Sequence, residues 1–231
     1  MKITEFIKKE LSGWKVYEIT GLIFVACLIL YNAIFLKDSL VAVCSAFCGI
    51  LYTNFAGKGK VSCYFFGLLG SGCYIYLSAA NHLWGNAFLY LLYYIPMQVR
   101  GIFEWRNNLD ESTNQIIKSV LNLGERIKYL SFGIFGCLIT IILLKFMQDT
   151  SPVIDGITTF LSILGMYFTV KRLIEQWVVW GIVNGLSFVM WLNLIMHGTR
   201  AYSTLIMWGV YLILAAYFYK VWQKEIVVKD C

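Results

Sequence analysis

The sequence predicts an all-α polytopic membrane protein with about eight transmembrane helices. Of its 231 residues, 59% are hydrophobic and 14% are charged, whereas a soluble domain has about 25% charged residues. The apolar residues form eight continuous segments, each near the ~20 residues that cross a bilayer. With eight spans, 16 of the lysines and arginines lie on one side of the membrane and 3 on the other. This bias marks the cytoplasmic side, so we expect both termini in the cytoplasm.

The eight apolar segments are predicted to be helices because a bilayer offers the backbone no water to bond. Continuous rather than alternating apolar runs exclude a β-barrel. Before the first of them, residues 1–15 have apolar side chains at helical spacing and lysines between them, which predicts an amphipathic helix on the membrane surface. The predicted spans are 16–36, 39–56, 61–80, 86–105, 128–147, 152–170, 176–196 and 200–222.

The two halves of the chain are predicted to be parallel three-helix bundles. Trp105 and Trp222 close the two halves 117 residues apart, and His82 and His197 follow the third and seventh spans at a similar offset of 115. Two units of like orientation are one arrangement found in transporters. The predicted parts are an N-terminal segment with an extra helix (1–38), the first bundle (39–105), a cytoplasmic loop and linker helix (106–150), the second bundle (151–222) and a tail (223–231).

The polar stretch of residues 106–127 is the natural divide between these halves. Its apolar residues Ile116, Val120, Leu123 and Ile127 recur every three or four positions. That spacing predicts a short cytoplasmic helix in part of the loop.

Cysteine, histidine and charge patterns give no sign of a cofactor, a metal or an enzyme. The seven cysteines are odd in number, and all but Cys231 lie in apolar runs, so we interpret them as small buried apolar residues. Neither histidine has metal-ligand spacing, and enzyme motifs are missing. The net charge of +6 reflects the cytoplasmic lysines and arginines rather than a nucleic-acid partner. We predict no catalytic residue, no cofactor, no metal site and no nucleic acid.

The seventh span carries the residues around which the predicted site is built. Trp177, Trp180 and Asn184 are spaced three and four apart and share one helix face. Two indole rings and a carboxamide there would stack on and hydrogen-bond a flat polar molecule. The alternative for the two rings is the aromatic belt at the membrane surface.

The fourth span carries a second polar stripe. Asn86, Tyr90, Tyr94 and Gln98 recur every four residues, and Pro96 is expected to kink the helix beside Gln98. Such amides also join helices within a membrane, which is the alternative to ligand contact. Trp208, in the last span, is predicted to lie deep enough to line a cavity.

No Asp, Glu or Lys is predicted at mid-depth in any span. Charged groups at that depth mark proton and ion pathways. Their absence favours a facilitator through which a substrate moves down its own gradient.

The sequence resembles the PnuC family of bacterial nicotinamide riboside transporters. The resemblance is carried by Tyr94-Ile-Pro-Met-Gln98 followed by Trp105, by Trp177-Val-Val-Trp180 with Asn184, and by Ala56-Gly-Lys-Gly-Lys60. It covers most of the chain after residue 40. The turn Trp84-Gly85-Asn86 departs from the expected aromatic-Gly-acid pattern, which makes a contact from Asn86 doubtful.

The resemblance implies a SWEET-like fold of two triple-helix bundles joined by a linker helix. It also implies a homotrimer in the bilayer that transports nicotinamide riboside by facilitated diffusion, with trapping by a cytoplasmic riboside kinase. Its implied binding residues are Gln98, Trp177, Trp180 and Asn184. Transport of another vitamin, a nucleoside or a sugar is the alternative within this fold, and a membrane enzyme or a non-transporting subunit is the alternative outside it.

Overall fold

A computed structural model describes residues 10, 13–36, 39–80, 84–110, 112–148, 151–197 and 202–229. The chain folds into two compact units, Met1–Ile117 and Lys118–Cys231. The predicted surface helix falls almost entirely outside the described residues, as does His82. The five-part division predicted from the sequence stays a prediction.

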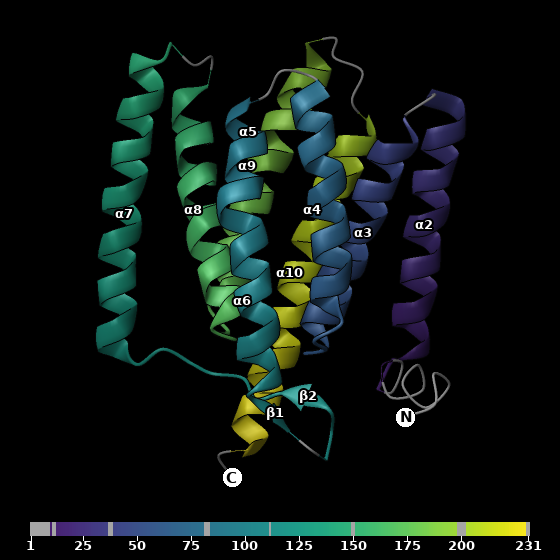
Figure 1. The fold of residues 1–231 in the computed structure, drawn as a ribbon, viewed down its shortest axis with the longest axis vertical. Coiled ribbons are helices and arrows are strands. Elements are labelled where there is room, and N and C mark those ends of the chain that lie inside the picture. Colours follow the sequence, from purple (N-terminus) through teal and green to yellow (C-terminus); the bar gives the residue numbers. More distant parts are fainter. Residues whose placement is uncertain are drawn as a thin grey trace. The chain divides into compact units, whose positions relative to one another are not determined.

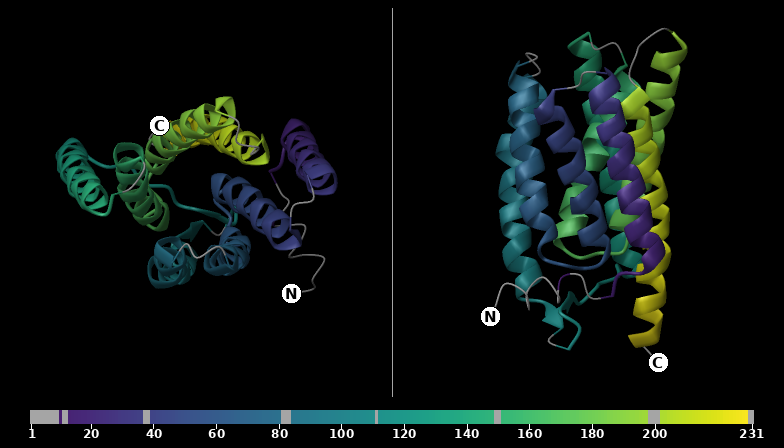
Figure 2. Two further views of the ribbon diagram at one scale, coloured as in Figure 1. Left: turned by 90° about the horizontal axis from the view of Figure 1, so that it is seen from above. Right: turned by 90° about the vertical axis from the view of Figure 1, so that its right-hand side faces the viewer.

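The first unit is a set of antiparallel helices followed by a small hairpin (Figure 1). Helix α3 lies between α2 and α4, which the end-on view in Figure 2 also shows. The fourth helical segment of this unit is interrupted by a π-helical turn, η1, which separates α5 from α6. The elements are α2 (Val16–Leu36), α3 (Leu40–Gly57), α4 (Cys63–Ala80), α5 (Trp84–Leu89), η1 (Tyr90–Tyr94), α6 (Ile95–Arg106), β1 (Leu109–Asp110) and β2 (Gln115–Ile116).

The second unit contains four helices that pack in sequence order. Helix α8 lies between α7 and α9, and α10 packs on α9. The bounds are α7 (Leu123–Phe146), α8 (Pro152–Val170), α9 (Gln176–Met196) and α10 (Tyr202–Lys229).

These helices confirm the predicted all-α polytopic membrane fold. Among the described residues, five helices are long and apolar enough to cross a membrane: α2, α3, α7, α8 and α10. Large apolar side chains on α2 and α7 point outward, as lipid contact requires; Ile34 is 73% and Phe146 83% exposed. The expectation that the cysteines are buried is wrong in part, because Cys27 and Cys44 are exposed on such outward faces.

The short helix predicted within residues 106–127 is wrong, since the structure has the β1–β2 hairpin there. The Asp110 carboxylate accepts the backbone N–H groups of Ser112 and Thr113 at 3.0 and 3.3 Å, and Asn114 has a positive φ of 52°. Both features favour a turn over a helix. Of the apolar residues behind that prediction, Ile116 lies in β2 and is 3% exposed, whereas Leu123 and Ile127 belong to α7 and are 75% and 58% exposed.

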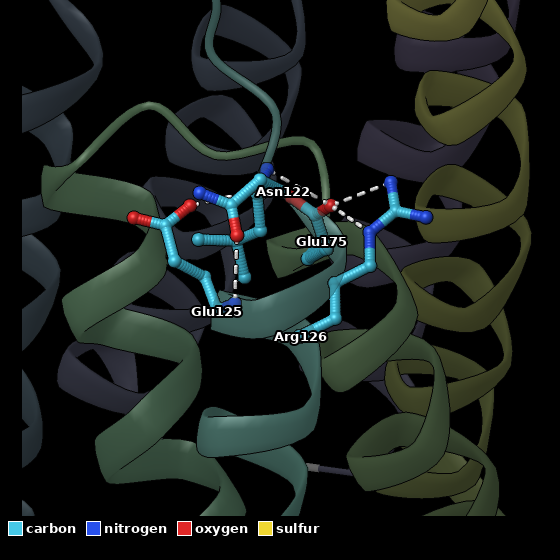
Figure 3. A network of polar contacts seen from close by, with 5 residues as sticks. Asn122, Glu125, Arg126 and Glu175 are labelled. Atoms are coloured by element: carbon cyan, nitrogen blue, oxygen red, sulfur yellow. Dashed lines mark hydrogen bonds and ion pairs between the residues drawn. The ribbon is translucent and has the colours of Figure 1, made fainter.

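Helix α7 begins earlier than predicted because its N-terminus is capped. The Asn122 side chain accepts the Glu125 N–H, and the Glu125 side chain accepts the Asn122 N–H, each at 2.9 Å. This capping box satisfies two backbone donors. Glu175 meets the same region from the α8–α9 loop, at 3.0 Å from the Arg126 guanidinium and 3.2 Å from the Leu121 N–H (Figure 3).

Both units contain the same helix-ending turn. The C-cap of α3 is Lys58 (φ −79°, ψ 0°), followed by Gly59 (φ 65°). The C-cap of α8 is Lys171 (φ −78°, ψ 1°), followed by Arg172 (φ 61°). The segment between α6 and α7 forms a backbone hydrogen bond to each of these turns. In each case the two bonded residues belong to the same unit. The Ile116 N–H donates to the Gly59 carbonyl at 3.0 Å, and the Ser119 N–H donates to the Arg172 carbonyl at 3.0 Å.

Replacing Gly59 by alanine is expected to lower the free energy of unfolding by about 1–2 kcal/mol, because an L-residue is strained at this φ. The new Cβ would also lie 3.1 Å from Ile116. Thermal unfolding of the purified protein in detergent measures the loss. Gly72→Ala is the matched control, since a Cβ at Gly72, within α4, meets nothing within 4 Å. Equal melting temperatures for the two variants would contradict the expectation.

Candidate functional site

Gln98, in α6, has a buried side-chain amide. One of its two polar atoms forms a hydrogen bond, and the other has no hydrogen-bond partner among the described residues. Its side chain is 4% exposed. Its Nε2 donates to the Ser71 hydroxyl on α4 at 2.8 Å, while Oε1 has no hydrogen-bond partner among the residues that the structure describes. An unsatisfied buried acceptor is costly, which makes Oε1 a candidate for accepting a hydrogen bond from a ligand.

Tyr94 lies in the π-helical turn that precedes Pro96. The Ile95 N–H bonds to the Tyr90 carbonyl, five residues back, which widens the helix at this point. The predicted stripe at four-residue spacing assumed a regular α-helix and missed this turn. The Tyr94 ring stacks on Tyr90 with centroids 4.5 Å apart and is 8% exposed. The side chain of Asn86, the first member of that stripe, lies outside the described residues.

Trp180 lies on α9 and is held against α8. Its Nε1 donates to the Thr169 hydroxyl at 3.1 Å, and its ring contacts the backbone at Gly165, where a Cβ would lie 3.0 Å from the indole. The side chain is only partly buried. Trp180 therefore offers a fixed and partly accessible indole ring.

Trp177 lies one turn earlier on α9 and is more deeply buried, at 4% exposed. Its ring packs against Phe218 at 5.4 Å and meets Trp222 edge-on at 5.6 Å. The alternative role as a belt residue does not fit a ring that the protein covers. Its indole N–H has no hydrogen-bond partner in the described part of the chain.

Asn184 and Trp208 complete the predicted set. Asn184 lies four residues beyond Trp180 on α9 and is 6% exposed. Trp208, on α10, is half-buried and meets Tyr211 edge-on at 6.0 Å. Its indole N–H also lacks a partner among the described residues. Trp177, Trp180, Asn184 and Trp208 all belong to the second unit, and Tyr94 and Gln98 to the first.

The buried charges of the described residues lie outside the spans that carry these groups. Glu10, Lys58 and Lys60 are buried, and so are the side chains of Glu18 in α2 and Lys118 before α7. None of these charges lies on α6, η1, α9 or α10. Burial lowers the pKa of Lys60, an effect that Glu10 opposes. No group of three or more metal-ligating side chains occurs in the described ranges. The candidate binding groups are thus aromatic rings and uncharged amides.

Sequence reasoning missed the residues that hold these groups in place. Ser71 and Gly67 lie in the Gly-rich stretch 67–72, which carries no sign of a partner on α6. Thr169 and Gly165 on α8 carry no motif. Only the three-dimensional contacts reveal them.

Helices with outward-facing apolar side chains, together with buried uncharged hydrogen-bonding groups in each unit, define a multi-pass membrane protein. The family profile described as nicotinamide mononucleotide transporter matches residues 39–224. The chain belongs to this transporter family, also known as the PnuC family, and is not an enzyme.

Individual relatives agree with this assignment. The nicotinamide riboside transporter PnuC of Neisseria mucosa is 30% identical over 223 residues, which cover 94% of this chain and 85% of the relative. The protein of the same name from Haemophilus influenzae is 28% identical, with 97% of each chain covered. A crystal structure of the vitamin B3 transporter PnuC matches with a TM-score of 0.83, 29% identity and 97% coverage of each chain.

Proposed function

We propose that the protein transports nicotinamide riboside across the bacterial inner membrane by facilitated diffusion. The observation that carries this proposal is the fixed, partly accessible indole ring of Trp180 in the second unit. The unpartnered acceptor of the buried Gln98 amide, in the first unit, is a second group suited to a polar substrate. Relatives of similar length are named for the same substrate. The six proposed binding residues are Gln98, Trp177, Trp180, Asn184, Tyr94 and Trp208.

The substrate's chemistry fits these groups. Nicotinamide riboside has a pyridinium ring, a carboxamide and a ribose. An indole face attracts a desolvated cation by ~2 kcal/mol. The Gln98 acceptor and the Asn184 amide suit the carboxamide and the ribose hydroxyls.

Nicotinamide mononucleotide is expected to be excluded, although the family profile is named for it. The described spans bury no lysine or arginine beside the proposed site, and a phosphate in an uncharged site loses its hydration without compensation. Proteoliposomes containing the purified protein should take up labelled riboside and leave the mononucleotide outside. Uptake of both at similar rates would contradict this expectation.

The transport cycle we propose is alternating access by two three-helix bundles. One bundle comprises α3, α4 and the helical segment α5–η1–α6, and the other comprises α8, α9 and α10. Helix α7 would link them, and α2 would stand outside the repeat. Rocking of one bundle against the other would expose the substrate to each side in turn.

We further propose that both termini are cytoplasmic, that the protein is a homotrimer and that a cytoplasmic riboside kinase traps the substrate. Phosphorylation adds about −1.5 to −2 charge, and the uncharged site would not return the product. Crosslinking one bundle to the other should abolish counterflow of labelled riboside in proteoliposomes. Continued flux after complete crosslinking would argue for a channel.

A second vitamin, a nucleoside or a sugar remains the alternative substrate on this fold. A neutral sugar would stack on Trp180 without the cation–π contribution. Competition for riboside uptake by thiamine, an uncharged nucleoside and glucose distinguishes these substrates.

A further inference from the structure

The indole ring of Trp180 is held at two points by α8. Its N–H donates to the Thr169 hydroxyl at 3.1 Å, and that hydroxyl donates in turn to the Gly165 carbonyl at 2.9 Å. Because the hydroxyl proton is directed to the carbonyl, an oxygen lone pair is left for the indole. Gly165 lets the ring lie directly against the α8 backbone, with a distance of 3.0 Å from a Cβ built there to Cε2 of the ring.

The amide of Gln98 is held in a similar way by α4. The Ser71 hydroxyl accepts its Nε2–H at 2.8 Å, and Ser71 is itself 4% exposed. One turn earlier, Gly67 leaves room for Oε1, which would lie 2.8 Å from a Cβ at that position. The amide nitrogen therefore has a hydrogen-bond partner, whereas the acceptor oxygen Oε1 has none among the described residues.

We propose that each of these two binding groups is positioned by one hydroxyl and one glycine, and that this positioning determines affinity for the substrate. The inference rests on the proposed function. Side chains fixed before binding lose little conformational freedom when the ligand arrives, so affinity rises without a new contact. The positioning residues are Thr169 and Gly165 for Trp180, and Ser71 and Gly67 for Gln98.

The hydroxyl of Thr169 is tested by two variants of nearly equal size. Calorimetric titration of the purified full-length protein with nicotinamide riboside should give about fivefold weaker binding for Thr169→Val, the size expected for one lost hydrogen bond. Thr169→Ser keeps the hydroxyl and should bind like the wild type. Unchanged affinity in the valine variant, or equal losses in both variants, would overturn the proposal for Trp180.

A spectroscopic readout separates positioning from general damage to the fold. The indole N–H resonance of Trp180, assigned by its loss in Trp180→Phe, should shift in Thr169→Val and stay in place in Thr169→Ser. This readout needs no ligand. If the wild type fails to bind the riboside, the proposed function fails, while the resonance still shows whether Thr169 holds the ring. An unshifted resonance in the valine variant overturns the positioning role.

The two glycines are tested against helical glycines of the same unit that have open space around them. Gly67→Ala and Gly165→Ala should each weaken riboside binding by about tenfold. The new Cβ at Gly67 would meet both Gln98 Oε1 and the Tyr52 ring at 2.8 Å, and the one at Gly165 would displace the Trp180 ring. Gly72→Ala on α4 and Gly181→Ala on α9 are the controls, since a Cβ at either position meets nothing within 4 Å. Ser71→Ala should weaken binding about fivefold. Losses no larger than those of the controls would overturn the proposal.

Discussion

Replacing Trp180 by alanine is expected to weaken nicotinamide riboside binding by about 30-fold. This loss of affinity corresponds to the ~2 kcal/mol by which an indole face attracts a desolvated cation. The variant also loses the hydrogen bond from the indole N–H to the Thr169 hydroxyl. Equilibrium titration of the purified variant measures the change, and uptake by proteoliposomes should fall with it.

A second variant on the same helix controls for the loss of any tryptophan. Trp191 lies on α9, eleven residues beyond Trp180, and is half-buried. Trp191→Ala should leave the affinity for the riboside within about twofold, because no cation–π contact is removed. If Trp180→Ala bound the substrate as tightly as Trp191→Ala, Trp180 would not be the stacking platform.

Replacing Lys58 by methionine is expected to lower the free energy of unfolding by about 3 kcal/mol. Lys58 and Glu18 form an ion pair of 2.6 Å in which both side chains are buried, at 9% and 6% exposed. Lys58 also donates to the Gly13 carbonyl at 3.0 Å. Removing one partner leaves the other charge buried without its counter-ion, which is the costly case for such pairs.

A double variant distinguishes an uncompensated charge from lost packing. Lys58→Met combined with Glu18→Leu should recover much of the stability, because no buried charge is then left without its counter-ion. Arg126→Met is the control, since Arg126 is 53% exposed in its pair with Glu175 and should contribute little. Thermal unfolding in one detergent compares the four proteins. A single Lys58→Met variant as stable as the wild type would contradict the account of this pair.

The helical spans could be predicted from the sequence because each one follows from length and hydropathy alone. Three predicted spans, 16–36, 152–170 and 176–196, coincide with α2, α8 and α9. Features that depend on hydrogen bonds of single side chains were missed. The Asp110 turn replaced a predicted helix, and the Asn122–Glu125 capping box moved the start of α7 from 128 to 123.

The candidate site, too, could be predicted from the sequence only in part. Spacing alone placed Trp177, Trp180 and Asn184 together on one helix, since three- and four-residue intervals bring side chains to one face. The π turn at Tyr90–Tyr94 could not be predicted, because no pattern in the sequence distinguishes this segment from a regular α-helix. Nor does any motif indicate that a serine on α4 binds Gln98 or that a threonine on α8 binds Trp180.

The most direct test of the proposed function is a tryptophan-fluorescence titration of the purified protein with nicotinamide riboside, beside nicotinamide, thiamine and glucose. We expect saturable quenching by the riboside alone, and its loss in Trp180→Ala. No response to the riboside together with a response to another solute would keep the transporter fold and reject the substrate. Riboside quenching that persists unchanged in Trp180→Ala would contradict the site.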